Sequence, residues 1–223
     1  KITISNISNC IRSEISTPLL DRFQRKIVYF HKPNFLDEFF SHPHLDKFVK
    51  QGPVTPDHVI RIKSKPLVLD FSKSKNYEIE KKIKYAIRKY ITDYKKYFSK
   101  NHKYNKFAKI LDPYPRMIVI KGVGIFSTGP TLKDAKIAMD VGLNSLSVIL
   151  NASKFGKFTS IPEKEIFRME YWPLELAKIK ASSARLKGTV TVITGGLGAI
   201  GYATAQKFKN EGSEVVILDV IHP

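Results

Sequence analysis

Four glycines and one acidic residue near the end of the sequence have the spacing of a phosphate-binding turn. Residues 194–201 read Thr-Gly-Gly-Leu-Gly-Ala-Ile-Gly. Glycines allow a tight turn and a close approach of the backbone to a pyrophosphate, and the N-terminus of a following helix attracts the negative charge. Asp219 lies 18 residues beyond Gly201. At a spacing of about 20, such a carboxylate can accept hydrogen bonds from the ribose hydroxyls of a dinucleotide.

Two strands and a helix must hold this turn in place. Thr189–Ile193 is a β-branched run suited to a buried parallel strand, residues 199–210 read as a helix, and Val215–Leu218 reads as a second buried strand that ends in Asp219. The order strand, glycine turn, helix, strand and acid distinguishes a cofactor-binding turn from a glycine turn with a purely structural role. We therefore expect the first β-α-β of a doubly wound Rossmann sheet. The expected cofactor-binding residues are Thr194, Gly195, Leu197, Ala199, Ile200, Gly201, Asp219 and Val220.

The expected cofactor is NAD rather than NADP. The Asp219 carboxylate would bond a free 2′-hydroxyl and repel a 2′-phosphate. No arginine follows it in residues 220–223, and the glycine turn contains no basic residue. The alternative is that a lysine from an earlier part of the sequence folds over the site and neutralises a 2′-phosphate.

Residues 194–201 resemble the Thr-Gly-x-x-x-Gly-x-Gly fingerprint of short-chain dehydrogenases, with Ala199 in place of the family's middle glycine. The resemblance implies hydride transfer between NAD and an alcohol or aldehyde. The family's catalytic Ser, Tyr and Lys lie well downstream of the second strand, so we expect the sequence to end before them and assign no catalytic residue. Tyr85 and Lys89 match the Tyr-x-x-x-Lys spacing, but they precede the cofactor strand and sit on a lysine-rich helix. We reject them as catalytic.

Four upstream segments resemble the middle of bifunctional proteins that fuse a class II aldolase to a short-chain dehydrogenase. They are residues 52–61, 111–116, 122–126 and 170–172. In that family the activity is a rhamnulose-1-phosphate aldolase joined to an alcohol or lactaldehyde dehydrogenase, which implies a role in rhamnose-type sugar catabolism. The implied fold is α/β.

The implied division places a class II aldolase-like region and linker at residues 1–180. The N-terminal part of an NAD-binding domain follows at residues 181–223. A non-catalytic linker or scaffold between two enzymes is the alternative function.

No metal is expected in this sequence. Class II aldolases usually carry a His-Gly pair that supplies a zinc ligand, and the corresponding turn here reads Gly122-Val123-Gly124. His42-Pro43-His44 with His58 is the other histidine group. Zinc sites use defined sets of His, Cys and carboxylate ligands, and a loop His-Pro-His with no Cys or acidic pattern nearby favours a surface feature.

Local patterns predict the remaining elements. Residues 1–50 read as helical pieces with aromatic anchors such as Tyr29 and Phe30, broken at Pro33 and Pro43. The other expected elements are a strand at 66–69, an amphipathic helix at 77–98, strands at 117–120 and 125–127, a helix at about 132–150 capped by Thr131, and a polar connector at 173–187.

The net charge of +18 raises the possibility of nucleic-acid binding, which is a further alternative. Only 8 of the 38 basic residues are arginine, and residues 188–223 carry a net charge of −1. We therefore expect a small-molecule substrate and no nucleic acid.

No apolar run approaches the roughly 20 residues that cross a bilayer, and Cys10 is the only cysteine. A cytoplasmic protein with no membrane partner is expected, homo-oligomeric as its full-length parent.

Overall fold

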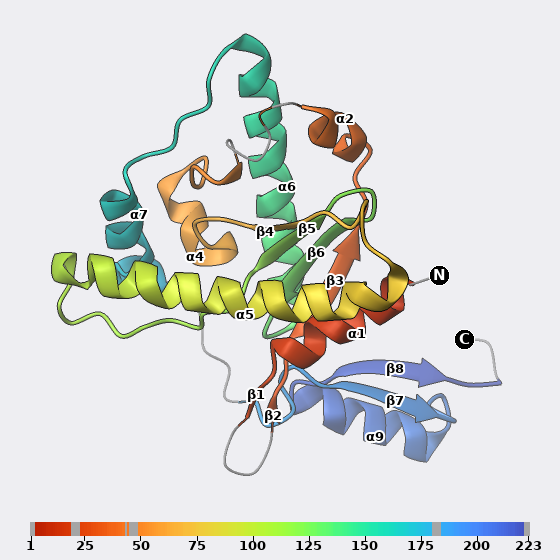
Figure 1. Ribbon diagram of the computed structural model, residues 1–223. Helices are drawn as coiled ribbons and strands as arrows, with labels where there is room; N and C mark the ends of the chain where they lie inside the picture. Colours follow the sequence, from red (N-terminus) through yellow and green to blue (C-terminus); the bar gives the residue numbers. More distant parts are fainter. Residues whose placement is uncertain (1–2, 19–22, 43, 45–48, 180–183, 221–223) are drawn as a thin grey trace.

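The computed structural model describes residues 3–18, 23–42, 44, 49–179 and 184–220, and Figure 1 shows their arrangement. The described helices are α1 (Ile4–Glu14), α2 (Leu36–Ser41), α4 (Val59–Ile62), α5 (Asn76–Asn101), α6 (Leu132–Phe155), α7 (Glu163–Glu170), α8 (Pro173–Ala177) and α9 (Ala199–Asn210), with short 3-10 helices η1 (Pro56–His58) and η2 (His102–Tyr104). The described strands are β1 (Thr17–Pro18), β2 (Phe23–Gln24), β3 (Ile27–His31), β4 (Leu67–Leu69), β5 (Met117–Ile120), β6 (Gly124–Gly129), β7 (Val190–Thr194) and β8 (Glu214–Leu218).

A four-stranded mixed sheet forms the centre of the larger region. Its strand order is β3-β6-β5-β4. β6 pairs antiparallel with both β3 and β5, whereas β4 pairs parallel with β5 and forms one edge. Every residue of β5 and β6 is buried, because helices cover both faces of the sheet.

The alternation of side chains along β5 divides its apolar run between two cores. Met117 and Val119 join the cluster that contains Leu146 of α6, whereas Ile118 and Ile120 join the cluster that contains residues of α1 and α5. Figure 1 accordingly shows α6 on one side of the sheet and α5 with α1 on the other. The larger region is therefore a three-layer α/β/α arrangement.

The two long helices confirm their sequence predictions. α5 buries Ile79, Ile83 and Ile87 on one stripe and leaves its lysines toward solvent. α6 begins at its cap, where Thr131 Oγ1 accepts a hydrogen bond from the Asp134 N–H at 3.1 Å. α6 continues to Phe155, five residues beyond the expected end.

The first 50 residues contain more strand than expected. Tyr29 and Phe30 lie in β3, which pairs antiparallel with β6 in the register Phe30↔Phe126. The helical prediction for residues 1–50 holds at α1 and α2 and is wrong at β3. The run in β3 is rich in β-branched and aromatic residues, which favour a strand once the neighbouring β6 pairs with it. Pro33 follows the strand, and Pro43 lies outside the described residues.

The C-terminal segment forms a parallel β-α-β unit, with β7 and β8 paired in the register Val190↔Glu214 to Thr194↔Leu218. The expected bounds of its helix agree with α9, but the expected burial of its strands is wrong. Val192 is 58% exposed and Leu218 is 52% exposed. Both belong to one face of a two-stranded sheet, and a single helix can cover only one face of such a sheet. The polar connector expected at 173–187 begins instead with α8.

Candidate functional site

The glycine turn between β7 and α9 is fixed by backbone hydrogen bonds. The Gly195 N–H donates to the Leu218 carbonyl at 2.8 Å, and the Gly198 N–H donates to the Gly195 carbonyl at 3.2 Å. Gly195 has φ +65°, in the left-handed region that favours glycine. The turn is thereby tied to the end of β8.

Two glycines of the turn have no room for a side chain. A Cβ on Gly201 would lie 2.1 Å from the Gly195 carbonyl oxygen, and a Cβ on Gly196 would lie 2.6 Å from the Ile217 side chain. Gly198 differs, because a Cβ there would meet its nearest neighbour at 3.4 Å, an ordinary contact. Gly196 is a residue that sequence reasoning left out of the site, although its place within the glycine run was a visible signal.

Asp219 lies against this turn. Its Oδ2 accepts a hydrogen bond from the Leu197 N–H at 2.8 Å. The structure therefore brings the acid at the end of β8 next to the turn that precedes α9. α9 has Gly198 as its N-cap, no side-chain cap and no acidic residue in its first turn. Its dipole therefore favours an anion at this end.

The predicted cofactor residues form one open surface at the C-terminal ends of the two strands. Thr194 ends β7, Asp219 and Val220 follow β8, and the others lie in the turn and the first turn of α9. Val220 is 98% exposed and Ile200 is 85% exposed. A ligand at this surface would contact backbone groups and the Asp219 carboxylate without displacing packed side chains.

A buried ionic cluster joins α4, α5 and α7 within the larger region. Lys63 Nζ lies 2.8 Å from the Tyr94 hydroxyl and 3.1 Å from Glu170 Oε1. Tyr94 also donates to Glu170 at 2.8 Å and contacts the Tyr171 hydroxyl at 2.7 Å. Burial lowers the pKa of Lys63, and the charge of Glu170 opposes that shift. Burial, followed by the charge of Glu170, raises the pKa of Tyr94.

Lys63 has a backbone conformation that is rare for any residue but glycine, with φ 66° and ψ 171°. Perturbed titratable groups of this kind occur both in active sites and in structural ion-pair networks. The cavity beside Lys63 is only about 20 Å³ and its lining is almost entirely apolar. That space is too small for a substrate, so the arrangement favours a structural role. Sequence reasoning missed this cluster, because no local signal connects Lys63 with a residue 107 positions away.

A second ionic group lies near the first. Asp112 pairs with Lys26 and with Arg116, whose Nη2 lies 3.2 Å from Asp112 Oδ2. Burial by itself would raise the pKa of Asp112. The charges of Arg116 and Lys26 act in the opposite direction, and the net shift in its pKa is downward. The Lys26–Asp112 pair joins the segment before β3 to the segment before β5.

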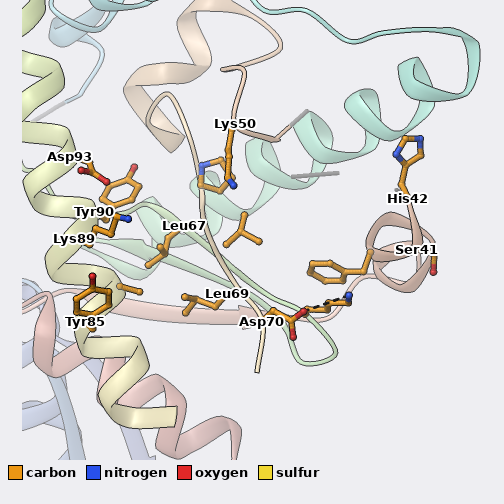
Figure 2. A pocket seen from close by; sticks show the side chains of 15 residues that line it. Ser41, His42, Lys50, Leu67, Leu69, Asp70, Tyr85, Lys89, Tyr90 and Asp93 are labelled. Carbon is orange, nitrogen blue, oxygen red and sulfur yellow. Dashed lines mark ion pairs between the residues drawn. The ribbon is translucent and has the colours of Figure 1, made fainter. Parts of the chain in front are cut away.

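An open groove of about 730 Å³ lies along the edge strand β4, between α5 and the end of α2. Figure 2 shows Leu67 and Leu69 at its base, with Lys50 and Lys89 on its walls. Tyr85, the other half of the rejected Tyr-x-x-x-Lys match, also lines this groove. Both residues of the match lie on α5 and not in the glycine turn. The Lys121 ammonium lies 3.6 Å from Asp70 and offsets its charge.

No group of three or more His, Cys, Asp or Glu side chains suited to a metal occurs among the described residues. His42 and His44 lie on the surface with their rings 6.2 Å apart. His58 is elsewhere, with its Nδ1 3.1 Å from the Ser145 hydroxyl. Every helix in the described part of the chain is too short or too polar to cross a bilayer.

These features define an α/β protein in which a three-layer region precedes a parallel β-α-β unit with a glycine turn. The chain belongs to the family described as "Aldolase class II, second domain", whose profile matches residues 3–179. This match confirms the expected class II aldolase-like region.

A comparison with curated proteins gives a relative in Bacillus subtilis (strain 168) that carries the name "Uncharacterized oxidoreductase YuxG". It is 30% identical over 224 residues, which cover 99% of this chain and 32% of the relative. The chain thus spans about a third of the length of that relative. No solved structure gives a significant match.

Proposed function

We propose that this chain contributes the start of an NAD-binding unit to an oxidoreductase that also contains a class II aldolase-type region. The observation that carries the proposal is the contact between the Asp219 carboxylate and the Leu197 N–H. It joins an acid at the end of one strand to the glycine turn at the end of its parallel neighbour. The name of the Bacillus relative, an oxidoreductase, supports the same class of activity.

The residues present fit a dinucleotide. The space that a Cβ on Gly201 would need is taken by the turn's own backbone, so the turn keeps the tight form that allows a pyrophosphate close to the start of α9. The Asp219 carboxylate would accept hydrogen bonds from the adenosine ribose, in exchange for or in addition to its bond from Leu197. NAD, when bound, supplies or accepts the hydride. The chain's own residues bind and orient it.

The proposed substrate of the full-length protein is an alcohol or aldehyde of rhamnose-type sugar catabolism. The support for this substrate is the likeness of residues 52–61, 111–116, 122–126 and 170–172 to bifunctional aldolase and dehydrogenase proteins. No residue of this chain is proposed to act on that substrate.

A titration of the full-length protein with NAD⁺ tests the proposed function through two matched glycine variants. Gly201→Ala places a Cβ 2.1 Å from the Gly195 carbonyl and must distort the turn, whereas Gly198→Ala introduces only an ordinary contact. We expect Gly201→Ala to weaken NAD⁺ binding at least tenfold and Gly198→Ala to change it less than about threefold, since only the first alters the shape of the turn. Calorimetry measures both constants.

Equal losses in the two variants, or no binding by the wild type, would exclude this turn as a cofactor site. The second of these results would favour the alternative function, a scaffold between two enzymes. The small cavity beside Lys63 is the structural observation that favours a scaffold for the larger region.

A further inference from the structure

The first residue of β8 reaches the first turn of α6. Glu214 Oε1 accepts a hydrogen bond from the Leu132 N–H at 2.9 Å, across 82 positions of sequence. Leu132 is the first residue of α6, and the N–H groups in the first turn of a helix have no partner within the helix. A carboxylate at this place also interacts favourably with the helix dipole. The β-α-β unit thus supplies part of the N-terminal cap of α6, the long helix that covers one face of the central sheet.

A second contact lies just before β7. Arg12 Nη2 of α1 donates to the Gly188 carbonyl at 2.8 Å. Gly188 is buried and has φ +80°, and a Cβ on it would lie 2.1 Å from the Arg25 carbonyl oxygen. The backbone at Gly188 therefore lies directly against the larger region, in a conformation and a space that favour glycine.

Both contacts are at one end of the β7–β8 pair, and the glycine turn is at the other. The register places Val190 beside Glu214 at the contact end, and Thr194 beside Leu218 at the turn end. A five-residue strand spans about 16 Å, so the two ends are separated by about that distance. A two-stranded sheet is marginal by itself. The contacts at Gly188 and Glu214 are thus placed to hold the strands that carry the turn.

We propose that Glu214 is a positioning residue for nucleotide binding, which holds the β-α-β unit against α6 of the aldolase-type region. The nucleotide role rests on the proposed function, whereas the docking role rests on the contacts alone. Loss of the Glu214 carboxylate leaves the Leu132 N–H without its partner and loosens β8 at its first residue. The disturbance reaches Asp219 through β8 itself, because Asp219 follows the last residue of that strand.

The test combines hydrogen exchange with NAD⁺ titration on the full-length protein, as wild type and with Glu214→Ala, Glu214→Gln or a matched control, Glu211→Gln. The control removes a charge three residues earlier, where the Glu211 carboxylate lies 3.6 Å from the Lys207 ammonium of the same unit. In Glu214→Ala we expect the Leu132 amide and the amides of β7 and β8 to exchange about tenfold faster, as for the loss of a hydrogen bond to a charged group. Glu214→Gln keeps an acceptor oxygen and should show a smaller effect.

NAD⁺ affinity should fall about fivefold or more in Glu214→Ala and stay unchanged in the control. Unchanged exchange of β7 and β8 in Glu214→Ala would overturn the docking role. Faster exchange with unchanged NAD⁺ affinity would overturn the positioning role. If wild-type protein binds no NAD⁺, the proposed function and this positioning role fail together, while the exchange results still decide the docking of the two parts.

Discussion

Lys63 is the one residue other than glycine, among those that the structure describes, whose backbone has a positive φ. Its backbone occupies a region that is nearly confined to glycine, at a cost of about 1–3 kcal/mol. Its side chain is 6% exposed and pairs with Glu170, whose side chain is 1% exposed. Such a conformation persists only when surrounding contacts determine it, and here the hydroxyl of Tyr94 and the carboxylate of Glu170 provide those contacts.

Removing one partner of this buried pair should destabilise the protein strongly. Lys63→Met leaves the Glu170 carboxylate buried without a cation, so we expect a loss of about 3–5 kcal/mol in the free energy of unfolding. The double variant Lys63→Met with Glu170→Gln should recover part of that loss, because no uncompensated charge remains. Urea unfolding measures both values.

The exposed pair Lys82–Glu78 provides the control for this measurement, since its ammonium and carboxylate lie 3.5 Å apart on the surface of α5. Lys82→Met should cost less than about 1 kcal/mol. A similar loss at Lys63 and Lys82 would show that the buried pair contributes no more than a surface pair.

At the scale of elements, α1 and α5 form the layer that covers one face of the central sheet. Cys10 of α1 is buried against α5, and its thiol lies 3.7 Å from the Glu80 carbonyl oxygen. Burial, followed by the charge of Glu80, raises the pKa of the Cys10 thiol to about 11. The thiolate, which is the reactive form, is therefore scarce near neutral pH.

This burial predicts that Cys10 reports on the contact between α1 and α5. At pH 8 iodoacetamide should modify Cys10 slowly in the folded protein and rapidly in urea, where the thiol regains an ordinary pKa of about 8.5. Mass spectrometry of timed samples gives both rates. Equal rates with and without urea would contradict the packing of α1 on α5.

Elements with a strong local pattern could be predicted from the sequence, and those that depend on distant partners could not. The isoleucine stripe of α5 and the cap of α6 at Thr131 are local signals, and both helices were predicted. β3 was missed, since Tyr29 and Phe30 become a strand through pairing with β6, about 100 positions away. The turn at 194–201 carries its own signature, whereas the pairing of Lys63 with Glu170 exists only in the folded chain.

At the scale of the whole molecule, the central sheet and the β-α-β unit differ in how completely they are covered. β5 and β6 are buried on both faces, whereas one face of β7 and β8 carries exposed apolar side chains, including Val192 and Leu218. The central sheet is therefore the stable part of the described structure. Seven lysines lie on α5, where Lys82 and Lys84 pair with Glu78 and Glu80.

The most direct test of the proposed function is the relative affinity for NAD⁺ and NADP⁺ of the full-length protein as wild type, Asp219→Ala and Asp219→Asn. Under the proposed function the Asp219 carboxylate, which accepts a hydrogen bond from the Leu197 N–H, would bond a free ribose 2′-hydroxyl and repel a 2′-phosphate. We therefore expect the wild type to bind NAD⁺ at least tenfold more tightly than NADP⁺. Asp219→Asn keeps an acceptor for the Leu197 N–H and removes the repulsion, which should raise the affinity for NADP⁺. Asp219→Ala should weaken NAD⁺ binding far more than NADP⁺ binding. Equal affinities in the wild type, or a ratio that neither substitution changes, would contradict the account.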